Sequence, residues 1–352
     1  MTSTNVLHKS VSTPVDIETR TDAFDYRPGH INDIPRLAQL FQSVYGQTTH
    51  PCQSPAYIRS SMDSGQQQWF VAELDSFLVG CCCVARRPWN QSWEMSHGVV
   101  HPAARRTGAI SNLVRLGLER HRPHAMELGF YVTRNIASHA LMKKIRPGVL
   151  VGHDGGPDKV DGIREYHLTA LLPPAQEGFV HVAPGYAHNG VAGPIIARLY
   201  DALRLTPPLG TYPATCLSGP PGAEVHGPLR FNHEPGADAL MVSGHLGDNP
   251  TQPATLQAIT ALLQRHPQVQ YFSVHILADK LELLAGLVSL GFAITAYLPA
   301  WHLEGGVRYD CILLVFEVFA DAPRSHGFDD EVAFFDQVYA KLTDSLCGIA
   351  LQ

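Results

Sequence analysis

The first half of the chain alternates short apolar runs typical of strands with amphipathic stretches typical of helices. Strands are predicted at residues 24–28, 69–73, 77–85, 93–101 and 126–133, with residues 74–76 closing a hairpin between the second and third. A first helix carries an apolar face of Ile34, Leu37, Leu40, Phe41 and Val44, with Asn32 or Asp33 as its cap. A last helix opens at Asn135. This pattern predicts an α/β fold with a mixed sheet.

A turn rich in arginine and glycine lies between the fourth strand and the next helix. Val99 and Val100 end the strand, and the turn with the helix start comprises Arg105, Arg106, Thr107, Gly108, Ala109, Ile110 and Ser111. The helix shows an apolar stripe of Ile110, Leu113, Val114, Gly117 and Leu118. Free N–H groups at a helix N-terminus, arginine charge and a glycine that permits close approach all favour a diphosphate. The alternative is an ordinary turn with solvated arginines, because short glycine motifs match by chance.

The order strand, helix, hairpin, strand, anion loop, helix, strand, helix resembles the GNAT superfamily of acyl-CoA-dependent N-acyltransferases. Pro102, Arg105, Gly108 and Ser111 fall on positions of that family's phosphate motif, and Ile110 departs from it where Gly or Ala is usual. Residues 26–28, residues 32–34 and Asn135 also resemble family positions, so the likeness covers about residues 24–168. The resemblance implies acyl-CoA held by Val99, Val100, residues 105–111 and Asn135.

The resemblance also implies direct attack of an amine on the thioester, which needs a base and usually an acid near the departing thiolate. Glu94 and His97, on the strand before the loop, are the candidate bases. A solvated strand carboxylate and a histidine at the core edge are the alternative interpretations. Met142 stands where the family usually has its acid tyrosine, and Tyr131 is a candidate replacement.

The second half repeats the first in outline. Residues 171–178 hold turn formers, and helices and strands of similar order follow, with strands at 178–184, 239–244, 271–277, 294–298 and 309–318. Residues 247–253 stand where the anion loop would be, but they carry an acidic group and two prolines in place of arginines. We therefore expect tandem GNAT-like domains: a tail at 1–22, an acyl-CoA-binding domain at 23–172 and a degenerate second domain at 178–352.

The composition of the chain limits the classes of partner and of bound metal that we expect. The chain has 352 residues, 45% of them hydrophobic, and a formal net charge of −6, which argues against a broad nucleic-acid surface. The sequence predicts no membrane segment and no secretory signal, which favours a cytoplasmic protein. Seven cysteines without regular spacing predict neither a disulfide framework nor a zinc site. His97 and His101 are the tightest histidine pair, but strand spacing separates them, so no metal is expected.

The sequence thus predicts an N-acyltransferase, most simply an N-acetyltransferase, that uses acetyl-CoA or another acyl-CoA and a small-molecule amine acceptor. The alternative is a catalytically silent CoA-binding or regulatory protein, which Met142, Ile110 and the degenerate second half suggest. The sequence does not predict the oligomeric state.

Overall fold

The computed structural model describes residues 24–46, 50–134, 136–160, 163–175, 177–247, 250–317 and 328–350. The tail expected at 1–22 lies outside these residues. The chain forms two compact units: unit 1 takes residues 1–83 and 97–120, and unit 2 takes 84–96 and 121–352. The sequence predicts a division at 172–178 instead. The two units are described separately below.

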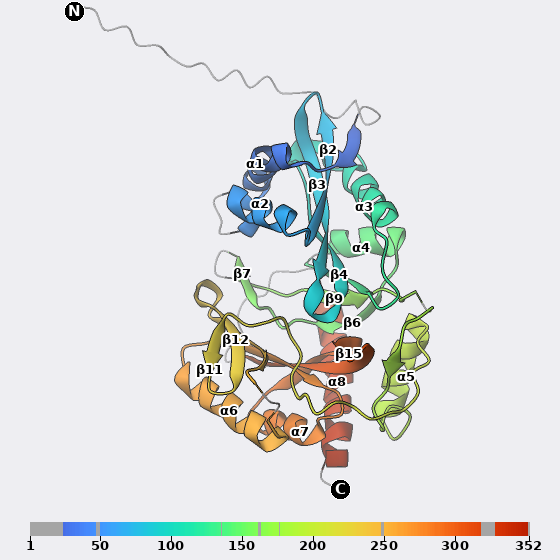
Figure 1. Cartoon of the computed structure of the whole chain (residues 1–352), viewed down its shortest axis with the longest axis vertical. Coiled ribbons are helices and arrows are strands. Elements are labelled where there is room, and N and C mark those ends of the chain that lie inside the picture. The colour runs from blue at the N-terminus through green and yellow to red at the C-terminus, as the bar shows by residue number, and fades with distance from the viewer. Residues whose placement is uncertain are drawn as a thin grey trace, which may run out of the picture. The chain divides into compact units, whose positions relative to one another are not determined.

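Unit 1 is a set of four strands with helices on both sides (Figure 1). Its strands are β1 (Asp25–Pro28), β2 (Gln67–Leu74), the first part of β3 (Phe77–Arg87) and the end of β4 (Ser92–Val100), in that order across the sheet. Its helices are α1 (Ile34–Tyr45), α2 (Pro55–Asp63) and α3 (Ala109–Arg120), with short 3₁₀ turns η2 (Ile31–Asp33), η3 (Pro51–Gln53) and η5 (Pro102–Ala104). The predicted hairpin and both predicted helices are present.

One detail of α1 differs from the prediction. Asp33 precedes the helix but makes no side-chain cap to it. Its carboxylate instead accepts the His30 amide at 2.8 Å and pairs with the guanidinium groups of Arg27, at 2.7 Å, and Arg36. Two nearby arginines compete with the helix amides for this carboxylate, because charge-assisted hydrogen bonds are the stronger ones.

Unit 2 is built on a long mixed sheet that begins with the other parts of β3 and β4. From β4 onward the strand order is β4-β5-β9-β6-β15-β16-β14-β13-β12-β11, with β10 beside β16 and a separate β7-β8 pair. The β4–β5 and β13–β14 pairs are parallel and most of the others are antiparallel, which confirms the α/β prediction. The strands are β5 (Leu128–Thr133), β6 (Val149–His153), β7 (Asp158–Val160), β8 (Ile163–Glu165), β9 (Leu168–Leu171), β10 (His181–Val182), β11 (Glu224–His226), β12 (Leu229–Glu234), β13 (Ala239–His245), β14 (Tyr271–Leu277), β15 (Ala293–Glu304) and β16 (Val307–Glu317).

The helices of unit 2 cover this sheet, and the last of them was not predicted. They are α4 (Ile136–Ile145), α5 (Ala192–Leu203), α6 (Gln252–Arg265), α7 (Leu281–Ser289) and α8 (Asp329–Ala350), with 3₁₀ turns η4 (Pro88–Asn90) and η6 (Pro235–Ala237). Helix α8 buries a stripe of Val332, Phe335, Tyr339, Leu342 and Leu346. Their spacing is helical, so the sequence did contain the signal for α8.

Two buried charged side chains of β16 are hydrogen-bonded within unit 2, and one of them, Arg308, ties β16 to the residues before β4. The guanidinium of Arg308 is fully buried and donates to the carbonyl oxygens of Asn90, Gln91 and Ala300 and, at 2.7 Å, to that of Met126. Asp310 is equally buried and accepts from His181, Tyr200, Tyr297 and the Ala300 amide. Buried charges are tolerated only when they are fully hydrogen-bonded. The contacts of Arg308 therefore fix where β4 and β5 begin.

Stability should fall at alkaline pH because of His167. Its ring lies 2.7 Å from an Asp154 carboxylate oxygen. Burial alone would lower the pKa of His167, but the charge and hydrogen bond of Asp154, helped by Asp158 and Glu165, raise it from 6.5 to about 9. One pKa unit is worth about 1.4 kcal/mol, so protonated His167 contributes about 3 kcal/mol. This contribution is complete below pH 6.5 and is lost as the pH rises through 9.

Urea unfolding of the wild type and His167→Gln at pH 6 and pH 9 measures the contribution of protonated His167 to the free energy of unfolding. We expect the difference in unfolding free energy between the two proteins to be large at pH 6 and small at pH 9. His124→Gln, at an exposed position, is the control and should match the wild type at both values. Equal differences at pH 6 and pH 9 would contradict the assignment.

Candidate functional site

The anion loop has the backbone shape of a ligand-binding turn. After η5, Arg106 and Gly108 both adopt left-handed conformations, with φ of 68° and 83°, and α3 then begins at Ala109. Thr107 braces the turn: its hydroxyl donates to the Ala104 carbonyl at 2.7 Å and accepts from the Ala109 amide at 3.4 Å. Left-handed residues in a turn bring neighbouring backbone amides to one side, and such nests bind anions. The predicted strand–loop–helix arrangement is confirmed.

Charge and space at this loop both suit an anionic ligand. The side chains of Arg105 and Arg106 are exposed. A Cβ built on Gly108 would meet no atom within 4 Å, so the space beside this residue is open. The first amides of α3 have no acceptor within their own helix, and its N-terminus carries partial positive charge. Backbone amides, guanidinium groups and open space therefore occur together at residues 105–109.

The structure gives a reason for the unusual Ile110. Its Cδ1 atom lies 3.3 Å from the place where a side chain on Gly98 would begin. Ile110 thus packs over a glycine of β4, where the missing side chain leaves room for a larger one. Val99 and Ala109 are buried, whereas Val100 and Ser111 are half-buried. Asn135, the remaining predicted ligand residue, lies outside the described residues.

Glu94 is a buried, ion-paired carboxyl group on the part of β4 that belongs to unit 2. Its side chain is only 5% exposed, and Arg87 donates to it at 2.7 Å. Burial raises the pKa of Glu94, although the charges of Arg87 and His167 oppose the shift. The interpretation as a solvated strand carboxylate is therefore wrong. A carboxyl group with a raised pKa is a better proton acceptor than an ordinary one.

His97 lies on the part of β4 that belongs to unit 1, and its backbone is strained. Its φ of 52° is left-handed, which is rare for a non-glycine residue inside a strand. Its ring is stacked on Trp69, with 5.6 Å between the centroids. Burial, with a smaller effect from His50, lowers the pKa of His97 to about 4. The imidazole is therefore neutral at physiological pH.

Tyr131, on β5 in unit 2, has the features of a proton donor held away from water. It is 1% exposed, and its hydroxyl has no hydrogen-bond partner among the described residues. Burial raises its pKa, so the phenol keeps its proton at neutral pH. Met142 is buried in α4 and has no proton to donate.

The start of α6, which the sequence analysis compares with the anion loop, is built differently from the start of α3. Helix α6 is capped by the side chain of Thr251, which accepts from the Ala254 amide at 3.4 Å. Pro253, in the first turn, has no amide hydrogen. A helix start that is already capped and interrupted by proline offers fewer amides to a diphosphate than the start of α3 does.

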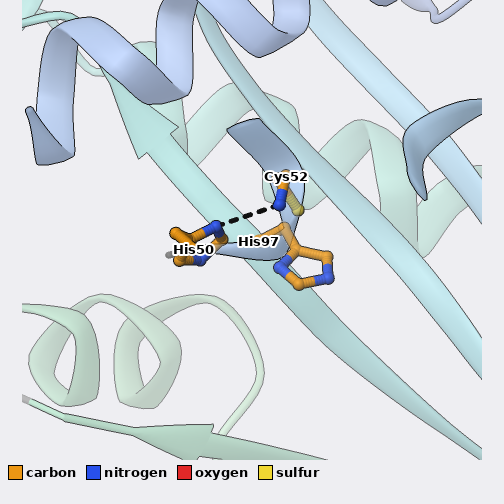
Figure 2. Close-up of side chains that lie close together, drawn as sticks. All are labelled: His50, Cys52 and His97. Carbon is orange, nitrogen blue, oxygen red and sulfur yellow. Dashed lines mark hydrogen bonds between the residues drawn. The ribbon is translucent and has the colours of Figure 1, made fainter. Parts of the chain in front are cut away.

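The sequence analysis missed a group of three side chains in unit 1. His50 and Cys52, at η3, lie beside His97, and the three possible ligand atoms are all within 4.8 Å of one another (Figure 2). Cys52 is fully buried, and its amide donates to Nδ1 of His50 at 3.2 Å. Sequence spacing could not reveal this group, because Cys52 and His97 are 45 positions apart and only the fold brings them together. All seven cysteines are free thiols.

Comparison with known proteins identifies a family segment in the chain. Residues 34–146 match the acetyltransferase (GNAT) family, and this segment contains α1, β4, the anion loop and α3. No curated protein matches the chain. Within the described residues, no helix is long and apolar enough to cross a membrane.

Several solved structures are similar to about two fifths of the chain. An N-acetyltransferase from Staphylococcus aureus Mu50 is 18% identical, with 42% of this chain and 97% of that chain covered and a TM-score of 0.36. A ribosomal-protein-alanine N-acetyltransferase from Brucella melitensis is 19% identical, with 42% and 98% covered and a TM-score of 0.36. The yncA protein of Salmonella typhimurium, solved with its cofactor acetyl-CoA, is 15% identical, with 43% and 93% covered and a TM-score of 0.37.

Proposed function

We propose that the protein is an acyl-CoA-dependent N-acyltransferase, most simply an N-acetyltransferase, that acts on a small-molecule amine. The main support is the left-handed turn at Arg106 and Gly108, which precedes α3 inside the segment matching the acetyltransferase family. The amides of residues 106–110 would hold the diphosphate of the acyl-CoA, and Arg105 and Arg106 would add charge. The thioester of the bound acyl-CoA supplies the activated acyl group.

Glu94 is the base in this proposal, acting directly or through a water molecule. A carboxylate that takes the proton of an ammonium group leaves the amine free to attack the thioester carbon. Tyr131 is the proposed donor of a proton to the departing thiolate, because its phenol is protonated and its hydroxyl has no partner among the described residues.

A silent CoA-binding or regulatory protein is the second candidate. The observation that favours it is Met142, a buried thioether at the position where the family usually carries its acid. The second candidate has no turnover, and as a regulatory or partner protein it need not bind CoA, so binding and turnover measured together separate the two candidates.

The test is a calorimetric titration with acetyl-CoA followed by thiol release with a panel of small amines. We expect one acetyl-CoA per chain, because only the N-terminal turn has the arginines and the glycine. We also expect amine-dependent release of free CoA. Binding without release would favour a silent CoA-binding protein, and absence of binding would exclude the acyltransferase and leave a regulatory or partner protein that binds no CoA. Two bound molecules per chain would contradict the degenerate second half.

A further inference from the structure

We propose that His50, Cys52 and His97 form a binding site for a zinc ion in unit 1. Two imidazoles and one thiol are a ligand set that Zn²⁺ prefers, and three protein ligands leave a fourth tetrahedral position for water. The three ligand atoms come from two separate elements, η3 and β4, and the fold brings them within 4.8 Å of one another. This proposal does not depend on the acyltransferase activity.

The distances require only a small closure. Ligand atoms around a tetrahedral zinc ion are about 3.5 Å apart when Zn–N is about 2.0 Å and Zn–S about 2.3 Å. Separations of up to 4.8 Å must therefore shrink by about 1 Å. Small shifts of η3 and of the half-buried His50 side chain, which Phe41 and Tyr45 flank, would supply this. The thiol proton of Cys52 passes to solvent when the sulfur binds the ion.

The backbone of His97 supports a role beyond packing. A non-glycine residue in the left-handed region costs about 1–2 kcal/mol, and such strain persists where the surroundings impose it, often at a functional site. In this conformation the ring meets both His50 and Trp69, with 5.8 Å between the two imidazole centroids. The His97 imidazole in this conformation lies beside the other two side chains of the group.

A neighbouring side chain is suited to orient the His97 ring. The amide nitrogen of Gln67 lies 3.4 Å from Nε2 of His97, and Oε1 of Gln67 is buried without a partner among the described residues. Amide oxygen and nitrogen are assigned from such contacts, and the two can be exchanged by a half-turn of the amide. After that half-turn Oε1 of Gln67 accepts a hydrogen bond from the Nε2–H group of His97. The other ring nitrogen, Nδ1, is then the one that binds the metal. Ligating histidines usually have such an acceptor on their other nitrogen.

The surroundings also suit a cation. The rings of Phe41 and Tyr45 stack against His50, at 5.0 and 4.7 Å, and Tyr57 meets His97 edge-on. A thiolate with two imidazoles leaves a zinc site with only one net positive charge. The low charge lets the site form with little exposure to water.

The experiment titrates Co²⁺, a spectroscopic substitute for Zn²⁺, into the full chain after removal of metals with EDTA, with Zn²⁺ competition to follow. We expect one equivalent to bind with a thiolate-to-cobalt charge-transfer band, which Zn²⁺ abolishes. Cys52→Ser should remove the band and weaken binding at least ~100-fold, since loss of even an outer-shell partner costs about 10- to 100-fold. Cys82→Ser, at an equally buried thiol outside the group, is the matched control and should keep the band.

His50→Gln is the second variant, needed if Cys52→Ser does not fold. His50 is half-buried, so its position tolerates the change. The substitution should weaken binding to a similar degree, while His188→Gln, at an exposed histidine, should not. Circular dichroism checks the fold of each variant. The proposal is overturned if the folded wild type shows no thiolate band, or if the folded Cys52→Ser and His50→Gln proteins bind Co²⁺ as the wild type does.

Discussion

Replacement of Gly108 by glutamate should abolish acetyl-CoA binding while the chain still folds. The new carboxylate would stand among the amides proposed to hold the diphosphate, where it repels the ligand and takes the hydrogen bonds itself. Each charge-assisted hydrogen bond is worth roughly 1.5–3 kcal/mol, so losing two of them weakens binding by about 10²–10⁴-fold. Calorimetry with acetyl-CoA measures the loss.

The matched control is Gly108→Gln. Both side chains have the same size, and both pay the cost of a left-handed backbone at φ 83°, about 1–2 kcal/mol. The open space around Gly108 accepts either of them. The difference between the two variants is therefore the effect of the charge. If Gly108→Glu and Gly108→Gln bind acetyl-CoA equally well, the diphosphate does not lie at this loop.

Local pattern was enough to predict most of the sequence-adjacent elements. The hairpin of β2 and β3, the strand β4 and the helix α3 all depend on alternation or helical spacing within about ten residues, and all are present. The turn residues Asp75 and Ser76 are both left-handed, as a tight hairpin between such strands requires. These elements are predictable because neighbours in sequence determine them.

Elements that depend on distant partners were less predictable. The short strands β6 and β9 pair with each other and bring residues 149–153 and 168–171 into the sheet of unit 2. Their sequences are too short to show a period, and only the pairing makes them strands. The division of the chain at residues 83–84, 96–97 and 120–121 depends in the same way on contacts between distant segments.

In the candidate site too, residues that only the fold brings together could not be predicted from the sequence. The anion loop is continuous in sequence, so its place between a strand and a helix could be predicted, although the left-handed backbone of Arg106 could not. The group of His50, Cys52 and His97 could not, because η3 and β4 become neighbours only in the folded chain. The burial of Glu94 could not be predicted either. In the sequence Glu94 looks like a solvent-facing strand residue, yet the structure buries it against Arg87.

Replacement of Glu94 by glutamine should lower turnover by about 10²–10⁴-fold at neutral pH, the range typical of a lost general base. Glutamine keeps the size of the side chain and can still accept from Arg87, but it cannot take a proton. Because burial raises the pKa of Glu94, wild-type activity should rise with pH above the usual carboxyl range, as the carboxylate forms. This acidic limb should disappear in Glu94→Gln. Initial rates of thiol release at saturating acetyl-CoA, measured across pH, test both effects.

The matched control is Glu127→Gln, because Glu127 is also a buried carboxyl group of unit 2 and lies 3.4 Å from an arginine, Arg86. Both variants leave a partly exposed arginine without its counter-charge, so their effects on folding should be similar. Only Glu94→Gln should lose turnover and the acidic limb, with acetyl-CoA affinity unchanged. If Glu94→Gln keeps wild-type turnover and the same pH profile, Glu94 is not the base, and the proton must leave through another group or through water.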